Sequence, residues 1–437
     1  MKFKKYFSFV TVFIIIIIVL NLFYNKGLFK EYYVLVPDNI KSLIKKTLLY
    51  LPAQQKKIQE LNGIVLDLEK QNEISESKIK NITNKIVLLQ KEKNLINEEF
   101  FPQTQFLDLE FQEIKLNNFK SIKSNYNRDG KLASPFYIDT YDNLVFAISK
   151  NSEVITIDLE NQKKITLIEN NLASFGNMEI GDILISENDL YISAVKKKDN
   201  CRDFIILKSK IDNKQLNFQN IFDFNDFDDC EEKSFLIGGR LKPFTLNNKK
   251  GFLITETDIY FIDVNENTKK LFASGFRNPQ GLFIKNDLVL ATDHGPRGGD
   301  EINKVEENKN YGWPDASYGE EYSLGFTSLE KNKYKKSHAE YGYIEPIFSF
   351  IPSIAISEII ELDNNFSKKW QDNYLISSLR AGSIYRVKFD ENFEKVIFYE
   401  KIKVGKRIRD IAFNKNKKLI LLALEDESGS LGIINVK

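Results

Sequence analysis

The sequence predicts an all-β head, a six-bladed β-propeller, carried on an N-terminal transmembrane helix and a coiled-coil-like helical stalk. Two observations predict the propeller. After Pro102 no segment keeps a helical period, and short strand-like runs recur between turn residues. About six units of strand, turn and strand fit into residues 103–437, at the roughly 40 to 50 residues typical of a propeller blade. Repeated units of this length argue against a β-sandwich, the competing all-β fold.

The N-terminal segment is predicted to be an uncleaved membrane anchor. Residues 7–24 carry no charge, are almost wholly apolar, and are just long enough to cross a bilayer as a helix. Three lysines in residues 1–6 place that end in the cytoplasm by the positive-inside rule. No site of the A-x-A kind follows, as a cleaved signal peptide would require. We therefore expect a single-pass protein of the cell membrane, with its head on the periplasmic or extracellular side.

The next segments are predicted to be a linker and a helical stalk. Residues 25–53 contain Pro37 and Pro52 and are interpreted as a mixed linker. Residues 54–99 carry apolar residues at alternating steps of three and four, which is a heptad repeat. Asn72 and Ser75 interrupt this seam, and an asparagine at such a position can fix register and oligomer number. The pattern favours a self-associating coiled coil, and the alternative is a single long helix lying along the head.

The strand-like runs of the head alternate apolar and polar residues. They are residues 143–159, 189–195 with 204–212, 251–264, 287–293, 373–390 and 418–437. An early strand over Leu107–Leu116 could complete the last blade and close the ring, which would remove the free sheet edges.

Composition excludes some functions and leaves a disulfide open. Lys plus Arg number 62 against 61 Asp plus Glu, so net charge gives no support for a nucleic-acid partner. Cys201 and Cys230 both lie in the exported part, where a disulfide is permissible. The sequence leaves open whether they are paired.

The segment 275–314 is far denser in glycine and proline than its surroundings. In the run DHGPRGGDE, three glycines and a proline force an irregular backbone whose carbonyl groups can turn inward. Asp300 and Glu301 follow directly. Bent carbonyls beside carboxylates suit calcium, which takes six to eight oxygen ligands. The alternative is an ordinary surface loop with solvated acids.

Three motifs in this region carry a resemblance to a known family. The runs RNPQG, HGPRGGDEIN and NYGWP, in this order and spacing, resemble the soluble PQQ-dependent glucose and aldose sugar dehydrogenases, also called glucose/sorbosone dehydrogenases. The resemblance covers about residues 180–437 and identifies the chain as a divergent member. It implies a six-bladed propeller and a quinoprotein oxidoreductase that oxidises a sugar CH–OH group. It also implies that calcium and PQQ sit together at the mouth of the propeller.

The resemblance assigns metal ligands to five positions. The carbonyls of Gly295 and Pro296 match those that hold the calcium polarising the cofactor. Glu301 and the carbonyl of Tyr311 match the ligands of a second calcium, and Glu321 lies where a further acid ligand is expected.

The resemblance also assigns five cofactor-binding residues. Arg277 and Asn278 match residues that touch the quinone oxygens of PQQ. Arg380, Arg407 and Arg409 lie where the family places basic residues against the PQQ carboxylates. Planar guanidinium groups bind carboxylates at two points, so the chemistry agrees. Each arginine taken alone would otherwise be a solvated surface charge.

One departure from the family pattern concerns the catalytic base. The family places a histidine two residues before GGRL as general base, and Leu236 occupies that position here. Leucine cannot accept a proton, and loss of a positioned base costs about 10²–10⁴-fold in rate. The chain has two histidines: His294 in the calcium loop, a weak substitute, and His338 in a lysine-rich run interpreted as an exposed insertion. The family's N-terminal blades are also hard to find in residues 125–177.

Two functions therefore remain open. The first is a membrane-anchored, exported sugar oxidoreductase that uses a different base. The second is a catalytically inactive propeller that binds a glycan or a protein. Leu236 favours the second function, and the retained Arg277, Asn278, Arg407 and Arg409 favour the first.

Overall fold

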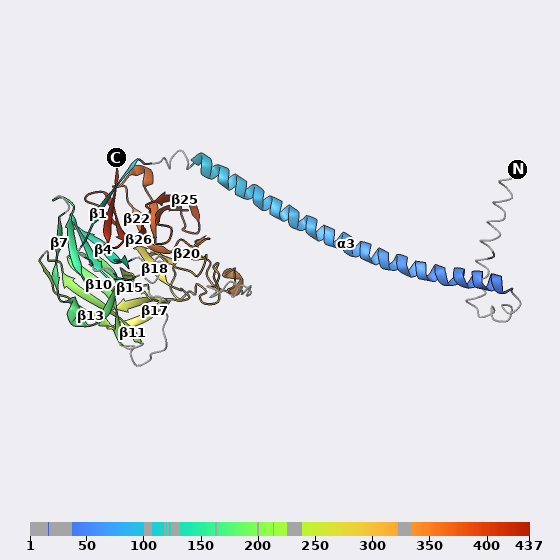
Figure 1. Ribbon diagram of the computed structural model, residues 1–437, viewed down its shortest axis with the longest axis horizontal. Coiled ribbons are helices and arrows are strands. Elements are labelled where there is room, and N and C mark those ends of the chain that lie inside the picture. The colour runs from blue at the N-terminus through green and yellow to red at the C-terminus, as the bar shows by residue number, and fades with distance from the viewer. Residues whose placement is uncertain are drawn as a thin grey trace. The chain divides into compact units, whose positions relative to one another are not determined.

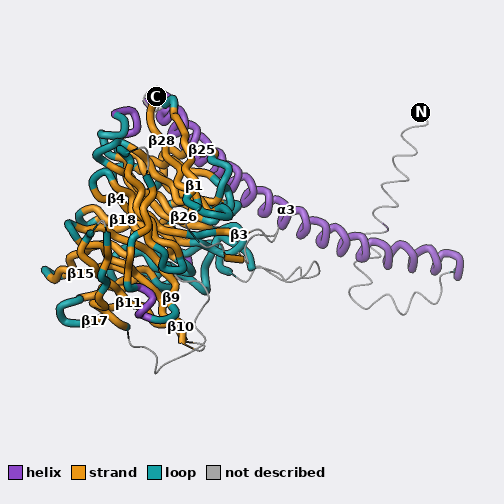
Figure 2. Tube along the Cα trace, turned by 60° about the vertical axis from the view of Figure 1, so that its left-hand side comes forward, coloured by secondary structure: helices purple, strands orange, loops and turns teal. Residues whose placement is uncertain are grey.

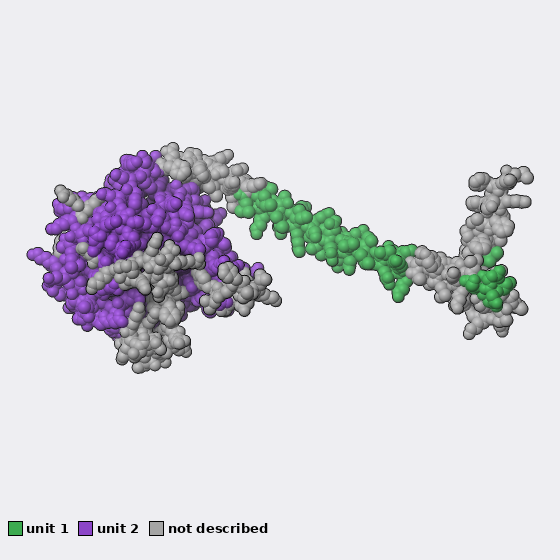
Figure 3. Space-filling view, in the orientation of Figure 1, with its two compact units in different colours: residues 1–95 green, residues 96–437 purple. Residues whose placement is uncertain are grey.

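The computed structural model describes residues 16, 37–99, 107–117, 119, 122–123, 132–161, 164–198, 201–212, 214–224, 238–321 and 334–437. The chain divides into two compact units, residues 1–95 and residues 96–437 (Figure 3). The first contains most of the stalk helix α3, and the second contains the head, which consists almost wholly of strands and loops (Figure 2).

The stalk is one helix, α3, which spans Asp38–Glu99 and has 62 residues. At 1.5 Å per residue it is roughly 90 Å long. It begins well before Gln54, so the prediction of a linker over residues 25–53 is wrong for residues 38–53. The two prolines do not prevent this helix. Pro37 precedes it, and its carbonyl accepts the first helical hydrogen bond, from the Lys41 N–H at 2.9 Å. Pro52 lies inside the helix and removes only one backbone hydrogen bond, so the helix continues on both sides.

The seam of the predicted coiled coil is exposed along α3. Its apolar residues are 47–63% exposed: Ile58, Leu61, Val65, Leu68, Ile79, Ile82, Ile86 and Leu89. Within the described part of the chain, no helix is long and apolar enough to cross a membrane. The predicted anchor, residues 7–24, lies outside the described residues except for Ile16. Anchoring and self-association therefore stay predictions.

The head contains six four-stranded antiparallel sheets among its described residues, which are the six blades of a propeller (Figure 1). From the inner strand outward they are β4 (Phe136–Tyr141), β5 (Leu144–Ser149), β6 (Val154–Asp158) and β7 (Ile165–Leu167); β9 (Met178–Ser186), β10 (Asp189–Lys198), β11 (Cys201–Lys210) and β13 (Gln219–Asp223); β14 (Leu241–Leu246), β15 (Lys249–Thr255), β16 (Ile259–Asp263) and β17 (Thr268–Ala273); β18 (Pro279–Lys285), β19 (Leu288–Asp293), β20 (Asp300–Lys304) and β21 (Phe348–Phe350); β22 (Ile356–Leu362), β23 (Asn373–Ser378), β24 (Ser383–Phe389) and β25 (Val396–Lys403); and β26 (Arg407–Asn414), β27 (Leu419–Glu425), β28 (Ser430–Val436) and β1 (Leu109–Lys115).

Each inner strand contacts the inner strands of the two neighbouring blades, and β26 contacts β4, so the six blades form a closed ring. The predicted six-bladed propeller is confirmed. Short elements lie in the loops within and between the blades: the strand pairs β2 (Ile122–Lys123) with β3 (Leu132–Ala133) and β8 (Glu169–Asn170) with β12 (Gln215–Leu216), and the 3₁₀ helices η2 (Leu172–Phe175), η4 (Ala339–Tyr341) and η5 (Lys368–Trp370).

The ring closes through the first strand of the head. Strand β1 pairs antiparallel with β28, from Leu109 opposite Val436 to Lys115 opposite Ser430. This confirms the closing strand that the sequence predicts over Leu107–Leu116. The same joint has an apolar core, in which Leu116 packs with residues of the first and last blades.

The first blade lies where the family pattern is hard to find. Strands β4 to β7 fall within residues 125–177 and bury Phe146, Ile148, Ile155 and Ile157 completely. Because a blade needs only alternating apolar residues and tight turns, the sequence of this blade can differ from the family pattern while the fold is retained.

Candidate functional site

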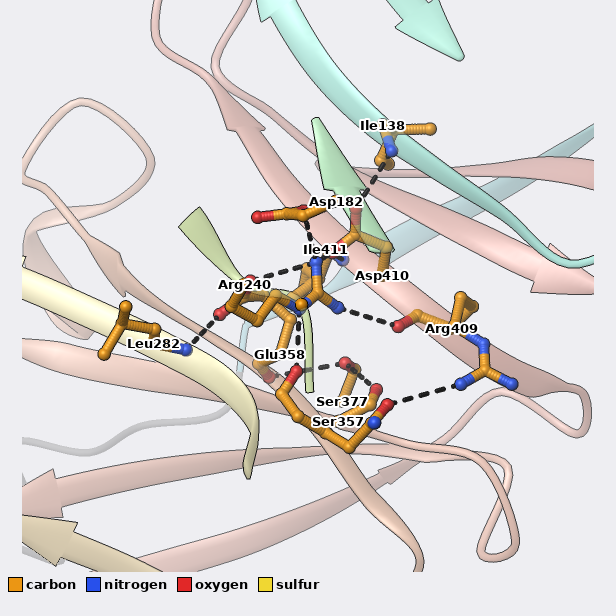
Figure 4. A network of polar contacts seen from close by, with 12 residues as sticks. Ile138, Asp182, Arg240, Leu282, Ser357, Glu358, Ser377, Arg409, Asp410 and Ile411 are labelled. Atoms are coloured by element: carbon orange, nitrogen blue, oxygen red, sulfur yellow. Dashed lines mark hydrogen bonds and ion pairs between the residues drawn. The ribbon is translucent and has the colours of Figure 1, made fainter. Parts of the chain in front are cut away.

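An arginine occupies the centre of the propeller. Arg240 is 1% exposed and stands just before β14, directly after Gly239. Its Nη1 lies 2.9 Å from Asp182 Oδ1, 3.1 Å from Glu358 Oε2 and 2.8 Å from Asp410 Oδ1 (Figure 4). The three acids belong to the inner strands of three other blades, so one guanidinium ties four blades together.

A glycine permits this arrangement. Gly239 has φ of 92°, and a Cβ built on it would lie 2.8 Å from the Cα of Gly181. Only a residue without a Cβ atom can adopt this backbone conformation and lie so close to the inner strand β9.

The buried acids also bind neighbouring backbones. Asp182 Oδ2 accepts a hydrogen bond from the Leu241 N–H at 2.9 Å, and Asp410 Oδ2 accepts one from the Ile138 N–H at 2.9 Å. Burial, with the nearby carboxylates of Asp410 and Glu358, raises the pKa of Asp182 to about 7, against the opposing effects of Arg240 and Lys242. The three carboxylates still outnumber the two cations, which favours retention of a proton among them.

Two predicted cofactor residues lie beside this centre, at the start of β26. The register of the strand shifts between Ile408 and Asp410, and both arginines pair with Glu425: Arg407 Nε lies 2.8 Å from Oε2, and Arg409 Nη2 lies 2.5 Å from Oε1. The Glu425 side chain is 2% exposed. Two guanidinium groups against one carboxylate leave an excess of one positive charge within this trio.

A glutamine that sequence reasoning missed links the predicted residues. Gln280 donates from Nε2 to Asn278 Oδ1 at 2.8 Å and accepts from Arg409 Nη1 at 3.4 Å. Its backbone carbonyl accepts from Arg240 Nε at 2.7 Å. The position of Gln280 in the motif RNPQG was its only sequence signal, and two of its partners, Arg240 and Arg409, come from other blades.

The RNPQG turn is held against the end of β19 by a carboxylate. Asp293 accepts the backbone N–H groups of Arg277 at 2.9 Å and Asn278 at 2.6 Å. This leaves the Arg277 guanidinium to donate from Nη1 to the carbonyls of His294 at 2.7 Å and Gly295 at 3.1 Å. The guanidinium also lies over the Trp313 ring, 5.5 Å from its centroid.

The charges of three of the four predicted arginines act on His294. Burial lowers the pKa of His294 to about 3, and the positive charges of Arg277, Arg409 and Arg407 add to this effect. The imidazole is therefore neutral at physiological pH. A group with so low a pKa is a weak proton acceptor, which gives His294 little strength as a substitute base.

The carbonyls predicted to hold the mouth calcium already have hydrogen-bond donors. Gly295 O accepts from Arg277, and Pro296 O accepts from the Ser353 hydroxyl at 3.0 Å. Each carbonyl oxygen keeps a second lone pair, so a cation fits chemically. The adjacent Arg277 guanidinium repels a cation, and a polycarboxylate bound beside both would offset that repulsion.

The second predicted metal position contains an unexpected histidine. Glu301 is 6% exposed, and its Oε1 lies 3.6 Å from Nε2 of His338. His338 is 1% exposed, so its interpretation as part of an exposed insertion is wrong. The chain returns at Tyr334–Ser337 and brings the imidazole against the Tyr318 ring, at 5.3 Å between centroids. Burial raises the pKa of Glu301 well above its ordinary value and lowers that of His338.

Other predicted residues do not join these groups. Tyr311 is buried in the same blade, with its hydroxyl on the carbonyl of Lys304 at 2.6 Å. Glu321 is exposed, and Arg380 is exposed in the bend after β23. Leu236 and Cys230 lie outside the described residues, as does the side chain of Cys201. In the described ranges, no group of three or more His, Cys, Asp or Glu side chains is placed to hold a metal ion.

Comparisons with known proteins agree with the motifs. The family model described as glucose/sorbosone dehydrogenase matches residues 252–433. The chain is 32% identical over 175 residues to the aldose sugar dehydrogenase YliI of Escherichia coli (strain K12), covering 39% of this chain and 45% of the relative. It is 25% identical over 209 residues to quinoprotein glucose dehydrogenase B of Acinetobacter calcoaceticus, covering 37% and 44%. The chain thus spans less than half the length of these curated relatives.

Solved structures support the fold. The crystal structure of the soluble aldose sugar dehydrogenase of Escherichia coli in its apo form is similar with a TM-score of 0.56 at 16% identity, over 75% of this chain and 100% of that one. A crystal structure of a glucose dehydrogenase is similar with the same TM-score at 17% identity and the same coverage. The recognition made from the motifs is confirmed: residues 252–433, which carry Arg277, His294 and Arg409, belong to the glucose/sorbosone dehydrogenase family.

Proposed function

We propose that the head is a quinoprotein-like sugar oxidoreductase that binds PQQ at its mouth. The observation that carries this proposal is a polar cluster in which Glu425 pairs with both Arg407 and Arg409, and Gln280 links Arg409 to Asn278, the residue after Arg277. Partly buried arginines in excess over acids suit a planar polycarboxylate. The similarity to aldose sugar dehydrogenases supports a sugar as the substrate.

The residues have distinct tasks in this proposal. Arg407 and Arg409 bind carboxylates of the cofactor, and Gln280 on β18 contacts Arg409 across the centre of the propeller and holds it in place. Arg277 and Asn278 face the quinone oxygens. When bound, PQQ supplies the hydride acceptor for oxidation of the sugar CH–OH group. Calcium, where it is present, is held by the carbonyls of Gly295 and Pro296.

A second candidate function is a propeller that binds its ligand without turnover. Leu236 stands at the position of the family's base, and the low pKa of His294 makes it a weak substitute. The same mouth would then bind an acidic glycan or an acidic protein segment through its arginines.

Calorimetry with PQQ and calcium tests the proposal on residues 96–437, a compact unit closed by β1. We expect calcium-dependent binding that Arg409→Ala weakens by at least tenfold, because Arg409 is part of the cluster. Lys401→Ala is the control and should change affinity much less, since Lys401 is exposed on β25, the outermost strand of its blade. Absence of binding at high micromolar PQQ would contradict the proposal. Binding without oxidation of any aldose by an artificial acceptor would favour the second function.

We further propose that residues 7–24 anchor the chain in a membrane and that α3 pairs with a second copy. The apolar seam of α3 supports the pairing, because a half-exposed stripe of this length is otherwise left in water.

A further inference from the structure

Two ion pairs lie next to each other where β26 begins and β27 ends. Arg407 is opposite Glu425 in the register of these strands, and this pair belongs to the polar cluster at the mouth. The neighbouring residues just beyond the two strands pair as well, with Lys406 Nζ 2.8 Å from Asp426 Oδ2. The second ion pair therefore closes the end of the ladder on which the first one stands.

The outermost strand of the same blade contributes a second acid to Lys406. Its Nζ also lies 2.5 Å from Glu113 Oε1. Glu113 is on β1, the outermost strand of the last blade, whereas Lys406 directly precedes β26, the innermost one. The Lys406 side chain thus links the strand that closes the ring with the strand that carries Arg407.

The groups around this lysine are partly buried and charged. The side chains of Lys406, Glu113 and Asp426 are 33%, 26% and 23% exposed, so solvent screens them less than surface pairs. Burial opposes the charge of Lys406, but its hydrogen bonds to both acids raise its pKa, and the ammonium stays protonated. Asp426 Oδ2 also accepts from the Ser430 hydroxyl at 2.5 Å, and Ser430 is opposite Lys115 of β1. Both acids are therefore tied to the same outer strand.

The backbone before Arg407 is held from the neighbouring blade. The carbonyl of Gly382 accepts the N–H groups of Val404 at 3.0 Å and Gly405 at 2.8 Å. A Cβ atom built on Gly382 would lie 3.1 Å from the carbonyl oxygen of Lys406, so the two segments are in close contact. With its backbone held on one side and its side chain on the other, Lys406 fixes the place from which Arg407 starts.

We propose that Lys406 is a positioning residue of the mouth, which holds Arg407 and Glu425 in place and, through Glu113, makes their placement depend on β1. This inference rests on the proposed function, in which Arg407 binds a carboxylate of the ligand. It adds a reciprocal effect: a ligand that needs Arg407 in place stabilises the docking of β1, and docked β1 raises the affinity for that ligand.

Hydrogen exchange of unliganded residues 96–437, measured by mass spectrometry, tests the link without a cofactor. Glu113→Gln should speed exchange several-fold in peptides that cover residues 405–410, although the substitution lies on the outermost strand. Glu110→Gln is the matched control, because it makes the same change at an exposed position of β1 and should leave these peptides unchanged. Equal exchange of residues 405–410 in both variants would overturn the proposal.

Calorimetry with PQQ tests the consequence for binding. Lys406→Met should weaken binding about fivefold, because charge-assisted hydrogen bonds to two acids are lost, and Lys406→Arg should restore most of the affinity. Adding Glu113→Gln to Lys406→Met should cause no further loss, since Glu113 acts through Lys406, and additive losses would contradict this. Lys417→Met is the control, because Lys417 pairs with Glu160 at the opposite end of β26.

The two measurements separate this inference from the function on which it rests. If PQQ binds neither the unsubstituted protein nor the variants, the proposed function fails, and hydrogen exchange at residues 405–410 still decides the role of Lys406. If Lys406→Met does not fold, Glu113→Gln decides in its place, because it leaves the pair of Lys406 and Asp426 intact. Unchanged exchange and unchanged PQQ affinity in Glu113→Gln would overturn the coupling.

Discussion

At the residue scale, Arg240 has the greatest structural importance, because it is the one cation bonded to three buried acids at the propeller centre. Removal of one partner of a buried ion pair is far more costly than loss of a surface pair, since the remaining charge stays buried without compensation. Arg240 also supports the proposed cofactor site, because it donates to the carbonyls of Gln280 at 2.7 Å and Arg409 at 3.2 Å.

Arg240→Met should therefore lower the free energy of unfolding by about 3–5 kcal/mol, measured by urea denaturation. Arg386→Met is the matched control. Arg386 is equally buried, but its one acidic partner, Glu400, keeps 19% exposure and can be hydrated. The control should lose less stability, and equal losses would show that packing, rather than charge at the centre, explains the effect.

Asp182 should make stability depend on pH. Its folded pKa of about 7 lies above its ordinary value of 3.8, so its contribution is fully present below pH 3.8 and is lost as pH rises through 7. Each pKa unit of difference corresponds to about 1.4 kcal/mol. Asp182→Asn should thus cost less stability at pH 8 than at pH 5, as measured by urea midpoints. If the urea midpoints of both proteins change with pH by the same amount, the assigned pKa of Asp182 is wrong.

At the element scale, strand β1 should decide whether the ring is stable. A chain that begins at residue 107 keeps β1 and Leu116, and one that begins at residue 117 loses both. We expect the shorter chain to unfold at a lower temperature and to aggregate, because β28 becomes a free edge and an apolar core loses a fully buried leucine. Equal Tm values for the two chains would mean that closure does not depend on β1.

Elements were more predictable from the sequence than the site. Alternation of apolar residues is local, so the strand runs and the closing strand could be read directly from the chain. The start of α3 at Asp38 could not, because Pro52 is an interruption that a long helix tolerates. The motifs pointed to Arg277, Asn278, Arg407 and Arg409 as candidates, whereas the contacts of Gln280 with Arg409 and of Glu425 with Arg407 join distant segments and have no local sequence signal. His338 was misjudged because the sequence around it is rich in lysine, whereas its burial depends on the packing of Tyr318.

At the scale of the whole molecule, the proposed pairing of α3 predicts the mass of the protein in solution. Residues 38–437 should sediment as a dimer, and residues 107–437 should sediment as a monomer. Asn72→Ile should allow larger assemblies, because a polar residue in the seam restricts the number of strands. A monomeric mass for residues 38–437 would contradict the pairing and leave α3 as a single long helix.

The connection between stalk and head has a mechanical consequence. The covalent tether enters the propeller through β1, the outermost strand of the last blade, which is bonded to β28 over seven residue pairs. Tension directed along β1 loads this whole ladder at once in shear, instead of peeling its bonds apart one after another. The strand that closes the ring is therefore also the joint that would carry any force between an anchored stalk and a captured ligand.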